Sequence, residues 1–407
     1  METLEPRDAG EVLDALRWAV AEEQPLELVG NGTKRGLGRP FQATHTLDLS
    51  ALSGIVSYEP EELVLTVRAG TPLAEVEALL ADRRQQLAFE PADWGPLFGA
   101  EPGRQTVGGA IACNLSGPRR IKAGAARDHL LGFEAVSGRA ERYKAGGRVV
   151  KNVTGYDLCK LLAGSHGTIS ALTEVTVKVL PAPERTRTVL LLGLDDAAGV
   201  AALTRALQGS FEAAGAAHLP APVAAASGVP AVAAAGAAVT AVRIEGFGPS
   251  VDYRAGRLVA ELGGLAPAVE LDDEASAAFW REVRDAAAFT RRPERIVWRL
   301  SVPPSQGPRV AAEIAARLDA EWFYDWGGGL LWVALAAAGE DAGAGAVRGA
   351  AGPNDGHATL LRAPETLRAS VAVFHPQPAA LAALSARVKA GFDPKRILNP
   401  GRMWAGV

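Results

Sequence analysis

The sequence predicts an α+β protein of two domains, and three observations carry that prediction. The chain has 407 residues, more than one hydrophobic core usually supports. Three glycine-centred patches lie beside β-rich runs in its first part, at residues 30–38, 106–117 and 151–174. After Pro181-Ala-Pro183 the sequence changes to alternating strand and helix patterns, so we expect the first domain to end near residue 182.

The composition fits a soluble, enzyme-sized protein. A net charge of −4 argues against a nucleic-acid-binding surface. No run approaches the roughly 18 apolar residues of a membrane span, and the acidic start at residues 1–5 is not that of a signal peptide. Cys113 and Cys159 make neither a disulfide framework nor a metal site, and we expect both to be small buried residues in a reducing cytoplasm.

The first glycine patch follows Leu26–Val29, an apolar stretch that alternates as a short strand would. Its glycines allow positive φ angles and bring several backbone N–H groups close to a phosphate. The spacing Gly30-x-Gly32-x-x-x-Gly36 differs from the G-x-G-x-x-G of a Rossmann site, and no acidic residue downstream is a clear ribose ligand. The sequence therefore disfavours a nicotinamide cofactor, and this patch alone is equally consistent with a tight turn.

The other two patches add polar groups that bind anions. Thr106–Gly117 runs into Pro118-Arg119-Arg120, and its small residues permit close approach of a ligand. The third patch combines Lys151-Asn-Val-Thr-Gly-Tyr-Asp157 with Gly164-Ser-His-Gly-Thr168 and leads into the strand-like Val175–Val179. In this order the three patches are far more specific than any one of them, and together they can cradle one extended phosphate-bearing cofactor.

Periodicity predicts the elements around these patches. Residues 9–20 show an amphipathic helix pattern, and residues 71–80 open with Thr71 as an N-cap and Pro72 at the first helical position. In the second domain the alternation predicts an antiparallel sheet backed by helices. The alanine-rich segments 213–238 and 342–352 are assigned no function. The expected strands are 188–192, 238–245, 296–300 and the glycine-linked pair within 322–335, and the expected helices are 197–208, 253–262 and 309–318.

A longer series of motifs runs through the first domain. In order they are Gly30-Asn-Gly-Thr33, Leu47-Asp-Leu-Ser-Ala-Leu52, Val67-Arg-Ala-Gly70, Thr106-Val-Gly-Gly109 and Gly164-Ser-His-Gly-Thr-Ile169. This series resembles the FAD-binding domain of the vanillyl-alcohol oxidase superfamily, the PCMH-type FAD-binding domain.

Further stretches narrow the resemblance. The ending Phe392-Asp-Pro-Lys-Arg-Ile-Leu-Asn-Pro-Gly-Arg-Met403 is similar to the carboxyl terminus of the hydroxy-acid dehydrogenase branch. Ser116–Arg120, Arg127-Asp128 and Lys151–Asp157 together resemble the FAD-binding subunit of bacterial glycolate oxidase. The resemblance covers about residues 5–182 and 365–403. It implies a PCMH-type domain of two α+β subdomains at 1–182, a substrate-like cap domain at 183–364, and a final strand and C-terminal segment, 365–407, that return to the FAD domain.

The resemblance also implies one FAD bound along all three patches. The first loop would hold the pyrophosphate by backbone donors, with added charge from Lys34. The second patch would continue along the pyrophosphate and ribityl chain, and the third would face the adenosine or the flavin edge. The expected cofactor-binding residues are Asn31, Gly32, Thr33, Lys34, Thr106, Gly108, Gly109, Asn114, Ser116, Gly164, Gly167, Thr168 and Ile169.

Three positions bear on how the flavin is held. Ser170 stands where the family usually has glycine, so its Cβ puts the local conformation in question. The first loop has Asn31 and Lys34 where covalent members would carry a histidine, and Cys113 matches a position that is normally small and packed. We therefore expect non-covalent FAD.

Catalytic residues stay unassigned. Oxidation of a 2-hydroxy acid requires a base or a metal-polarised hydroxyl, together with a cationic clamp for the carboxylate. The resemblance implies a His-rich metal motif in catalytic relatives, but the six histidines here are scattered, so no metal ligand is assigned. His375 is a weak candidate and His166 a second one, although a structural role is favoured for both. Three roles stay open for Arg119 and Arg120: binding a substrate carboxylate, contacting a phosphate, or forming a salt bridge at a subunit surface.

The resemblance implies the FAD-binding subunit of a glycolate oxidase complex, which oxidises glycolate to glyoxylate. Its expected partners are a larger flavin subunit that carries the hydroxy-acid site and an iron–sulfur subunit that takes the electrons onward. Two alternatives stay open: a free-standing FAD-dependent 2-hydroxy-acid dehydrogenase of the D-lactate type, and a non-catalytic scaffold. We expect a cytoplasmic hetero-oligomer that meets the inner membrane only peripherally, through partners.

Overall fold

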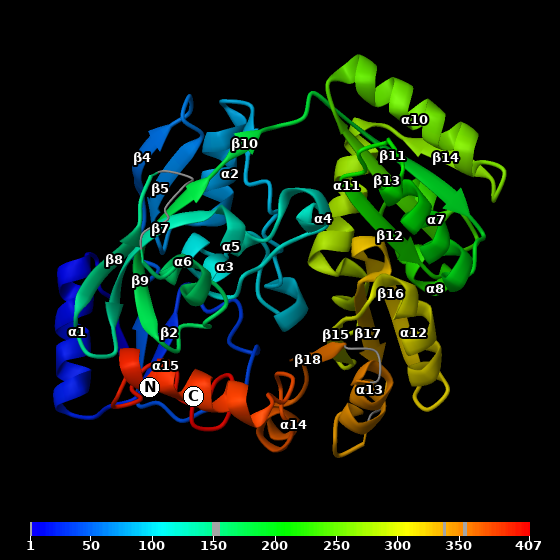
Figure 1. Ribbon diagram of the computed structural model, residues 1–407. Helices are drawn as coiled ribbons and strands as arrows, with labels where there is room; N and C mark the ends of the chain where they lie inside the picture. The colour runs from blue at the N-terminus through cyan, green and yellow to red at the C-terminus, as the bar shows by residue number, and fades with distance from the viewer. Residues whose placement is uncertain (1, 149–154, 337–338, 353–355) are drawn as a thin grey trace. The chain divides into compact units, whose positions relative to one another are not determined.

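The computed structural model describes residues 2–148, 155–336, 339–352 and 356–407, and the chain forms two compact units (Figure 1). Unit 1 comprises the chain up to Ser116, Gly124–Pro181 and Ala372–Val407. Unit 2 comprises Gly117–Ala123 and Ala182–Val371. The short segment Gly117–Ala123 thus belongs to unit 2, although its neighbours in sequence on both sides belong to unit 1. The motif residues Lys151–Thr154 lie outside the described residues.

Unit 1 contains two main sheets. A parallel three-stranded sheet has the order β1-β3-β2, and an antiparallel five-stranded sheet has the order β4-β5-β9-β7-β8. The short strands β6 and β10 pair separately. The elements are β1 (Glu2–Leu4), α1 (Ala9–Ala21), β2 (Leu26–Val29), β3 (His45–Asp48), β4 (Ile55–Glu59), β5 (Val64–Arg68), α2 (Leu73–Ala81), β6 (Gln85–Gln86), α3 (Val107–Ala112), α5 (Ala126–His129), β7 (Leu130–Ser137), β8 (Arg142–Gly146), α6 (Leu158–Leu162), β9 (Ser170–Lys178), β10 (Leu180–Pro181) and α15 (Ala379–Phe392).

Helix α1 joins the two sheets of unit 1 through one apolar core. Asp8 caps the helix by accepting hydrogen bonds from the backbone N–H groups of Gly10 and Glu11. Its apolar positions Val12 and Leu16 recur at helical spacing and are fully buried. They share a core with Leu26, Leu47, Val136, Ala171, Ile397 and Leu398, which come from both sheets and from the C-terminal segment.

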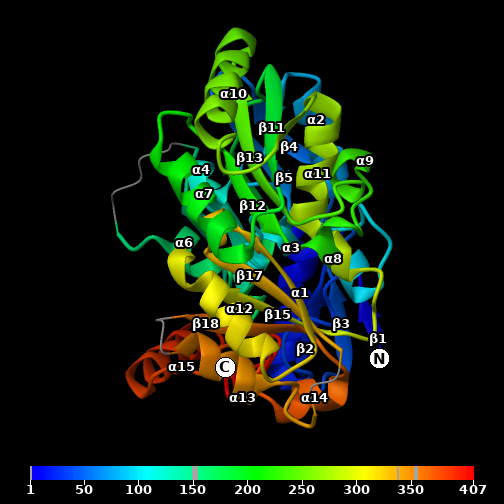
Figure 2. The ribbon, with the colours of Figure 1, turned by 90° about the vertical axis from the view of Figure 1, so that its right-hand side faces the viewer.

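Unit 2 is built on one sheet of eight strands in the order β14-β11-β13-β12-β16-β17-β15-β18, all antiparallel (Figures 1 and 2). The predicted antiparallel sheet backed by helices is therefore confirmed. The elements are α4 (Arg120–Ala123), β11 (Arg185–Leu192), α7 (Asp196–Gln208), β12 (Gly215–Leu219), α8 (Ala221–Ala224), α9 (Pro230–Ala233), β13 (Val239–Gly246), α10 (Gly248–Leu262), β14 (Ala268–Leu271), α11 (Asp273–Asp285), β15 (Ile296–Ser301), α12 (Gly307–Ala315), β16 (Ala320–Asp325), β17 (Leu330–Leu335), α13 (Ala344–Ala351), β18 (His357–Arg362) and α14 (Glu365–Ser370).

Helices cover both faces of this sheet. Val189 and Leu191 of β11 share a buried cluster with apolar residues of α7 and α10. Successive side chains of a strand point to opposite faces, and Thr188 accepts a hydrogen bond of 2.8 Å from the indole of Trp280 on α11. Helix α11 therefore packs on the face opposite to α7 and α10.

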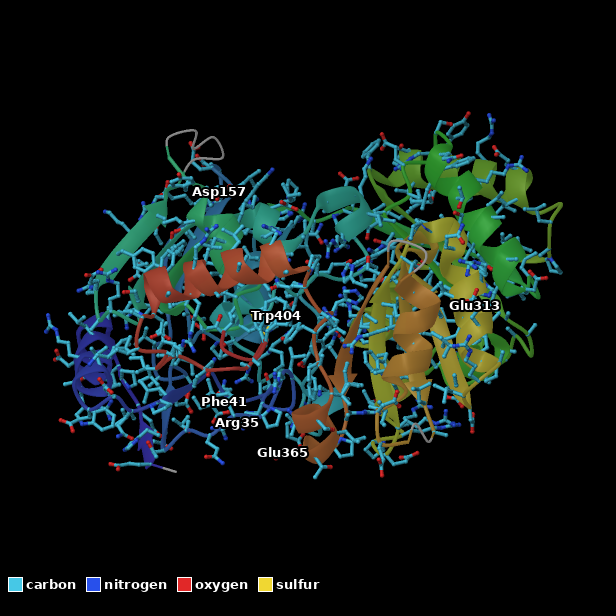
Figure 3. The ribbon with its side chains drawn as sticks, turned by 60° about the horizontal axis from the view of Figure 1, so that its bottom comes forward. Arg35, Phe41, Asp157, Glu313, Glu365 and Trp404 are labelled. Carbon is cyan, nitrogen blue, oxygen red and sulfur yellow. The ribbon has the colours of Figure 1, made fainter. Side chains whose placement is uncertain are left out.

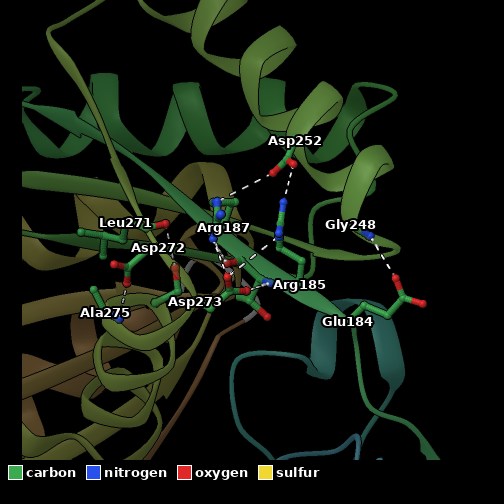
Figure 4. Close-up of polar contacts among 11 residues, drawn as sticks. Glu184, Arg185, Arg187, Gly248, Asp252, Leu271, Asp272, Asp273 and Ala275 are labelled. Carbon is green, nitrogen blue, oxygen red and sulfur yellow. Dashed lines mark hydrogen bonds and ion pairs between the residues drawn. The ribbon is translucent and has the colours of Figure 1, made fainter.

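A polar network ties the first strand of unit 2 to two of its helices (Figure 4). Arg185 donates to Asp252 of α10 at 2.5 Å, and Arg187 donates to Asp273 of α11 at 2.7 Å. Glu184 accepts a hydrogen bond from the N–H of Gly248 at the start of α10. Because the carboxylates are about half exposed, we assign this network a role in orientation more than in stability.

Two predictions about these elements were wrong. Thr71 does not cap α2, because the N-cap position falls on Pro72 and the Thr71 hydroxyl oxygen accepts from the N–H of Gly54 at 3.0 Å, while its O–H donates to the carbonyl of Arg68 at 2.7 Å. The strand expected to return to the first domain within residues 365–407 is not present among these residues, which are all described: the last strand, β18, comes before residue 365 and pairs with β15 in unit 2. The C-terminal segment, expected from residue 365, enters unit 1 at Ala372. None of the described helices is long and apolar enough to cross a membrane.

A buried ion pair fixes the C-terminal segment. The amine of Lys389 donates to Asp393 at 2.7 Å, and also to the carbonyls of Thr168 and Leu398 at 2.5 and 2.8 Å. The Asp393 carboxylate accepts from the N–H groups of Ile397 and Leu398. Both side chains are at most 1% exposed. Every polar atom of the pair is thus used to hold chain segments together.

We predict that Lys389→Met lowers the free energy of unfolding by roughly 3–5 kcal/mol, because it leaves a buried carboxylate without its partner. The measurement is urea unfolding of the whole chain at neutral pH. The matched control is Lys395→Met, which removes an exposed pair with Glu23 and is expected to cost less than about 1 kcal/mol. Equal losses in both variants would contradict the assignment.

Candidate functional site

Unit 1 contains a cavity with about 800 Å³ of space free of protein atoms, part of it open to solvent. Concave sites of this kind, lined by apolar residues and a few polar groups, are typical of small-molecule and cofactor binding. Three stretches far apart in sequence line most of it: the loop after β2, helix α3, and the turn before β9. Most of the lining residues lie in the three glycine patches that the sequence singles out, and Arg402 joins them from the C-terminal segment.

The loop after β2 turns Thr33 and Lys34 into the cavity. Gly32 has a φ of 63°, and the N–H of Arg35 donates to its carbonyl at 3.2 Å. Thr33 and Lys34 are consequently buried and line the cavity, whereas Arg35 also pairs with Glu27. A Cβ at Gly30 would lie 2.7 Å from the hydroxyl oxygen of Thr106, so the loop reaches α3 only because this residue is glycine.

Helix α3 forms the second wall. Thr106 is its N-cap and accepts a hydrogen bond of 3.2 Å from the N–H of Gly109. A Cβ at Gly108 would lie 2.8 Å from the carbonyl oxygen of Ala69. A Cβ at Gly109 would lie 3.8 Å from the amine of Lys34, so a larger side chain there would enter the space beside that amine. The two glycines thus have different roles, one in packing and one in leaving the cavity open.

The turn before β9 forms the third wall. Gly167 has a φ of 69°, and the N–H of His166 donates to the carbonyl of Ala112 at 2.9 Å, which ties this turn to α3. Ser170 begins β9 without a positive φ, and its hydroxyl lies 2.6 Å from that of Tyr143. The backbone therefore accommodates the Cβ of Ser170, although the family usually has glycine at this position.

The charged and titratable groups at the cavity give it a positive character. The amine of Lys34 is buried, which lowers its pKa, and it donates to the hydroxyl of Thr33 at 3.1 Å. Burial raises the pKa of the Cys113 thiol, so that group is neutral at pH 7. Burial, together with the charges of Arg402 and Lys34, lowers the pKa of His166 to about 3. The cations at the cavity therefore sit beside a neutral imidazole and a neutral thiol.

The structure brings some of the expected cofactor-binding residues to the cavity and leaves others beside it. Gly32, Thr33, Lys34, Thr106, Gly108, Gly109 and Gly167 line it. The side chain of Asn31 donates to the carbonyl of Arg104, and Ile169 is buried in the core. Asn114 and Ser116 accept hydrogen bonds from the N–H groups of Arg127 and Ala126. Gly164 has a φ of 89°, and the Thr168 hydroxyl donates to Ser165. These last residues shape the turns around the cavity.

The two histidines considered as catalytic candidates differ in their position relative to the cavity. His166 lines the cavity, with its ring centre 4.9 Å from that of Phe374. His375 is not among the described lining residues, and its carbonyl accepts a hydrogen bond of 3.1 Å from the indole of Trp404. Trp404 belongs to unit 1, as do Arg35 and Phe41 (Figure 3). Within the described ranges, no group of His, Cys, Asp or Glu could hold a metal ion.

Arg119 and Arg120 lie in the segment that belongs to unit 2. Arg119 makes a two-pronged ion pair with Glu245 at 2.6 and 2.8 Å, which favours the salt-bridge interpretation. The guanidinium of Arg120 lies 4.5 Å from the ring centre of Trp326, and that of Arg299 lies 5.0 Å from the same ring. Trp326 also donates to the carbonyl of Gly117 at 3.1 Å, so it packs within unit 2.

Sequence reasoning missed two charged residues that line the cavity, Arg35 and Arg402. The Arg402 side chain is 7% exposed, and it donates to the carbonyl of Lys34 at 3.2 Å. The motif Asn399-Pro-Gly-Arg402 was the available signal, but nothing in its local pattern says which distant segment it meets.

We predict that His166 makes the stability of the cofactor-free protein depend on pH. Because its folded pKa is about 3 and its ordinary value is 6.5, the unfolded chain binds the proton first, and stability falls as pH drops below 6.5. Between pH 7.5 and 5.0 this group should remove on the order of 2 kcal/mol. Urea unfolding at both pH values should show a smaller difference for His166→Asn; an unchanged difference would refute the assignment.

Comparison with known proteins identifies the cofactor class. Residues 3–146 match the FAD binding domain family. The chain is 35% identical over 395 residues to the glycolate oxidase subunit GlcE of Escherichia coli (strain K12), which covers 97% of each protein. It is 30% identical over 188 residues to the glycolate oxidase subunit GlcD of Bacillus subtilis (strain 168), covering 46% of this chain and 38% of that protein.

Solved structures show the fold. The chain superposes on p-cresol methylhydroxylase with a TM-score of 0.72 at 14% identity, covering 100% of this chain and 88% of that one. Alkyldihydroxyacetonephosphate synthase gives a TM-score of 0.69, covering 98% of this chain and 75% of that one.

The cavity itself fits FAD, since it offers a buried amine for an anionic group and a glycine at position 109 that leaves room beside it. The predicted PCMH-type fold and FAD cofactor are thus confirmed. The similarity to GlcE runs through both units and both ends of the chain, and the protein therefore belongs to the family of the glycolate oxidase subunit GlcE.

Proposed function

We propose that this chain is the FAD-binding subunit of a glycolate oxidase complex, which oxidises glycolate to glyoxylate. The observation that carries the proposal is the cationic cavity of unit 1 in a chain that matches GlcE along 97% of its length. When bound, FAD supplies a two-electron acceptor for a 2-hydroxy acid and a donor to the next electron carrier.

The residues of this chain bind and position that cofactor. We propose Gly32, Thr33 and Lys34 of the first loop and Thr106, Gly108 and Gly109 of the second patch as the groups that hold it. Gly167 would complete the third wall. Asn31, Asn114, Ser116, Gly164, Thr168 and Ile169 would act by holding the surrounding turns in place, since their described contacts are with backbone or core.

We further propose that the flavin is held without a covalent bond. Such a bond needs a nucleophile beside the ring, and the two candidates at the cavity are Cys113 and His166. Burial raises the pKa of the Cys113 thiol, which keeps it from forming the reactive thiolate. Because the His166 ring is positioned by Phe374, we assign it a packing role.

The proposed partners are a larger flavin subunit that carries the hydroxy-acid site and an iron–sulfur subunit. Cys113 and Cys159 are the cysteines of this chain, too few to hold an iron–sulfur cluster by themselves. Electrons leaving the flavin must therefore pass to another protein, a quinone or oxygen. A place in the cytoplasm, with contact to the inner membrane only through these partners, completes the proposal.

An anaerobic absorbance spectrum of the purified chain tests this function against its alternatives. We expect a flavin band that stays oxidised when glycolate or D-lactate is added, and that bleaches with glycolate once the partner subunits are present. The flavin should be released from the denatured protein. Bleaching of the isolated chain would instead identify a free-standing hydroxy-acid dehydrogenase, and a folded chain that rejects added FAD would identify a scaffold.

The assignment of Gly109 leads to a separate prediction. Gly109→Trp should abolish flavin retention, because the indole would occupy the space beside Lys34. Gly391→Trp is the matched control, since Gly391 is exposed on α15 with no atom near a built Cβ. The ratio of flavin absorbance to protein absorbance after gel filtration measures the effect. Normal flavin content in the Gly109 variant would exclude this placement of the cofactor.

A further inference from the structure

Lys34 is a buried basic residue with no ion-pair partner among the described residues, although Asp93 acts on it electrostatically. The residue is 9% exposed, and its amine has one hydrogen-bond partner, the hydroxyl of Thr33 at 3.1 Å. No carboxylate of a described residue forms an ion pair with it. Because an ammonium removed from water without a directly paired counter-charge is unfavourable, an anion that enters the cavity gains from this group.

Arg402 brings a second buried cation to the same cavity from the other end of the sequence, whereas Arg35, which also lines it, is exposed and pairs with Glu27. Its guanidinium donates to the carbonyl of Lys34 at 3.2 Å and lies 5.7 Å from the ring centre of Phe41. A Cβ at Gly38 would lie 2.9 Å from the Arg402 side chain, so the loop is shaped to admit it. An anion bound in the cavity would therefore interact favourably with two basic side chains.

The C-terminal segment fixes the place of Arg402 through backbone and side-chain bonds. The N–H of Leu26 donates to Ile397 at 2.7 Å, and the N–H of Asn399 donates to Leu26 at 3.0 Å. The Asn399 side chain accepts from the N–H of Leu28 and donates to the carbonyl of His166, both at 2.9 Å. The segment is thus attached to two walls of the cavity immediately before it supplies the guanidinium.

We propose that Arg402 is a cofactor-binding residue, which forms with Lys34 a cationic site for the diphosphate of FAD, so that the docked C-terminal segment completes the cofactor site. The inference rests on the proposed function only in taking FAD as the ligand of the cavity. The diphosphate is the occupant that fits, because it is anionic in every redox state, whereas the flavin ring gains negative charge only on reduction. Arginine also matches phosphate oxygens with paired donors.

The test compares FAD affinity and flavin redox potential in variants of the full chain. Arg402→Gln and Lys34→Met should each weaken FAD binding roughly ten- to a hundredfold, the loss expected for a charge-assisted contact. Arg402→Lys, which keeps the charge, should recover part of the affinity. Arg387→Gln, an exposed position on α15, is the control and should bind as the wild type does. Thermal unfolding of the cofactor-free proteins verifies that each variant folds.

The midpoint potential of the bound flavin separates the diphosphate from the ring. Weaker binding with an unchanged potential supports the proposal. A lowered potential in the Arg402 and Lys34 variants would overturn it, because the cations would then face the flavin ring. Unchanged affinity in both variants would also overturn it. A wild-type chain that fails to bind FAD would reject the proposed function itself, which is a distinct result.

Discussion

The buried pair of Lys389 and Asp393 is the interaction on which the cofactor cavity depends. One amine holds the carbonyl of Thr168 in the turn before β9 and that of Leu398 in the C-terminal segment, while its carboxylate partner organises the backbone at residues 397 and 398. The turn is a wall of the cavity, and the segment leads directly to Arg402. A buried pair is rarely the most stable solution at such a place, but it fixes the geometry of the groups it binds.

The electrostatics of the cavity follow from that geometry. Lys34 and Arg402 are held away from water, and burial, together with their charges, lowers the pKa of His166 and keeps it neutral. A neutral imidazole and a neutral thiol are poor nucleophile and acid candidates at pH 7, whereas the two cations are suited to an anionic cofactor. The cavity is therefore better equipped to hold a flavin than to activate a hydroxy acid, in agreement with a subunit that works beside another.

The sequence was informative where the structure is local and less so where it depends on distant contacts. The glycine patches could be identified from the sequence because each needs glycine within a short stretch, for a positive φ at Gly32 and Gly167 or for close backbone packing at Gly108. Arg402 was not, because its role is set by a loop more than three hundred residues away in the sequence.

Alternative local partners and tertiary packing explain the other misses. Thr71 has the residue type of a cap, but its hydroxyl oxygen accepts a hydrogen bond from the N–H of Gly54 instead of a helix N–H. The alanine-rich stretch 213–238 includes β12, a buried strand between β13 and β16. The sequence did not predict this strand because alanine has only a weak preference for strands. In each case packing or a competing hydrogen bond outweighed local preference.

Hydrogen exchange of the purified chain with and without FAD tests the central claim most directly. If the cofactor occupies the cavity and the C-terminal segment completes it, FAD should slow exchange together in residues 30–38, 106–114, 164–170 and 397–402. Protection confined to unit 2, or protection of the glycine patches without the C-terminal segment, would contradict the account.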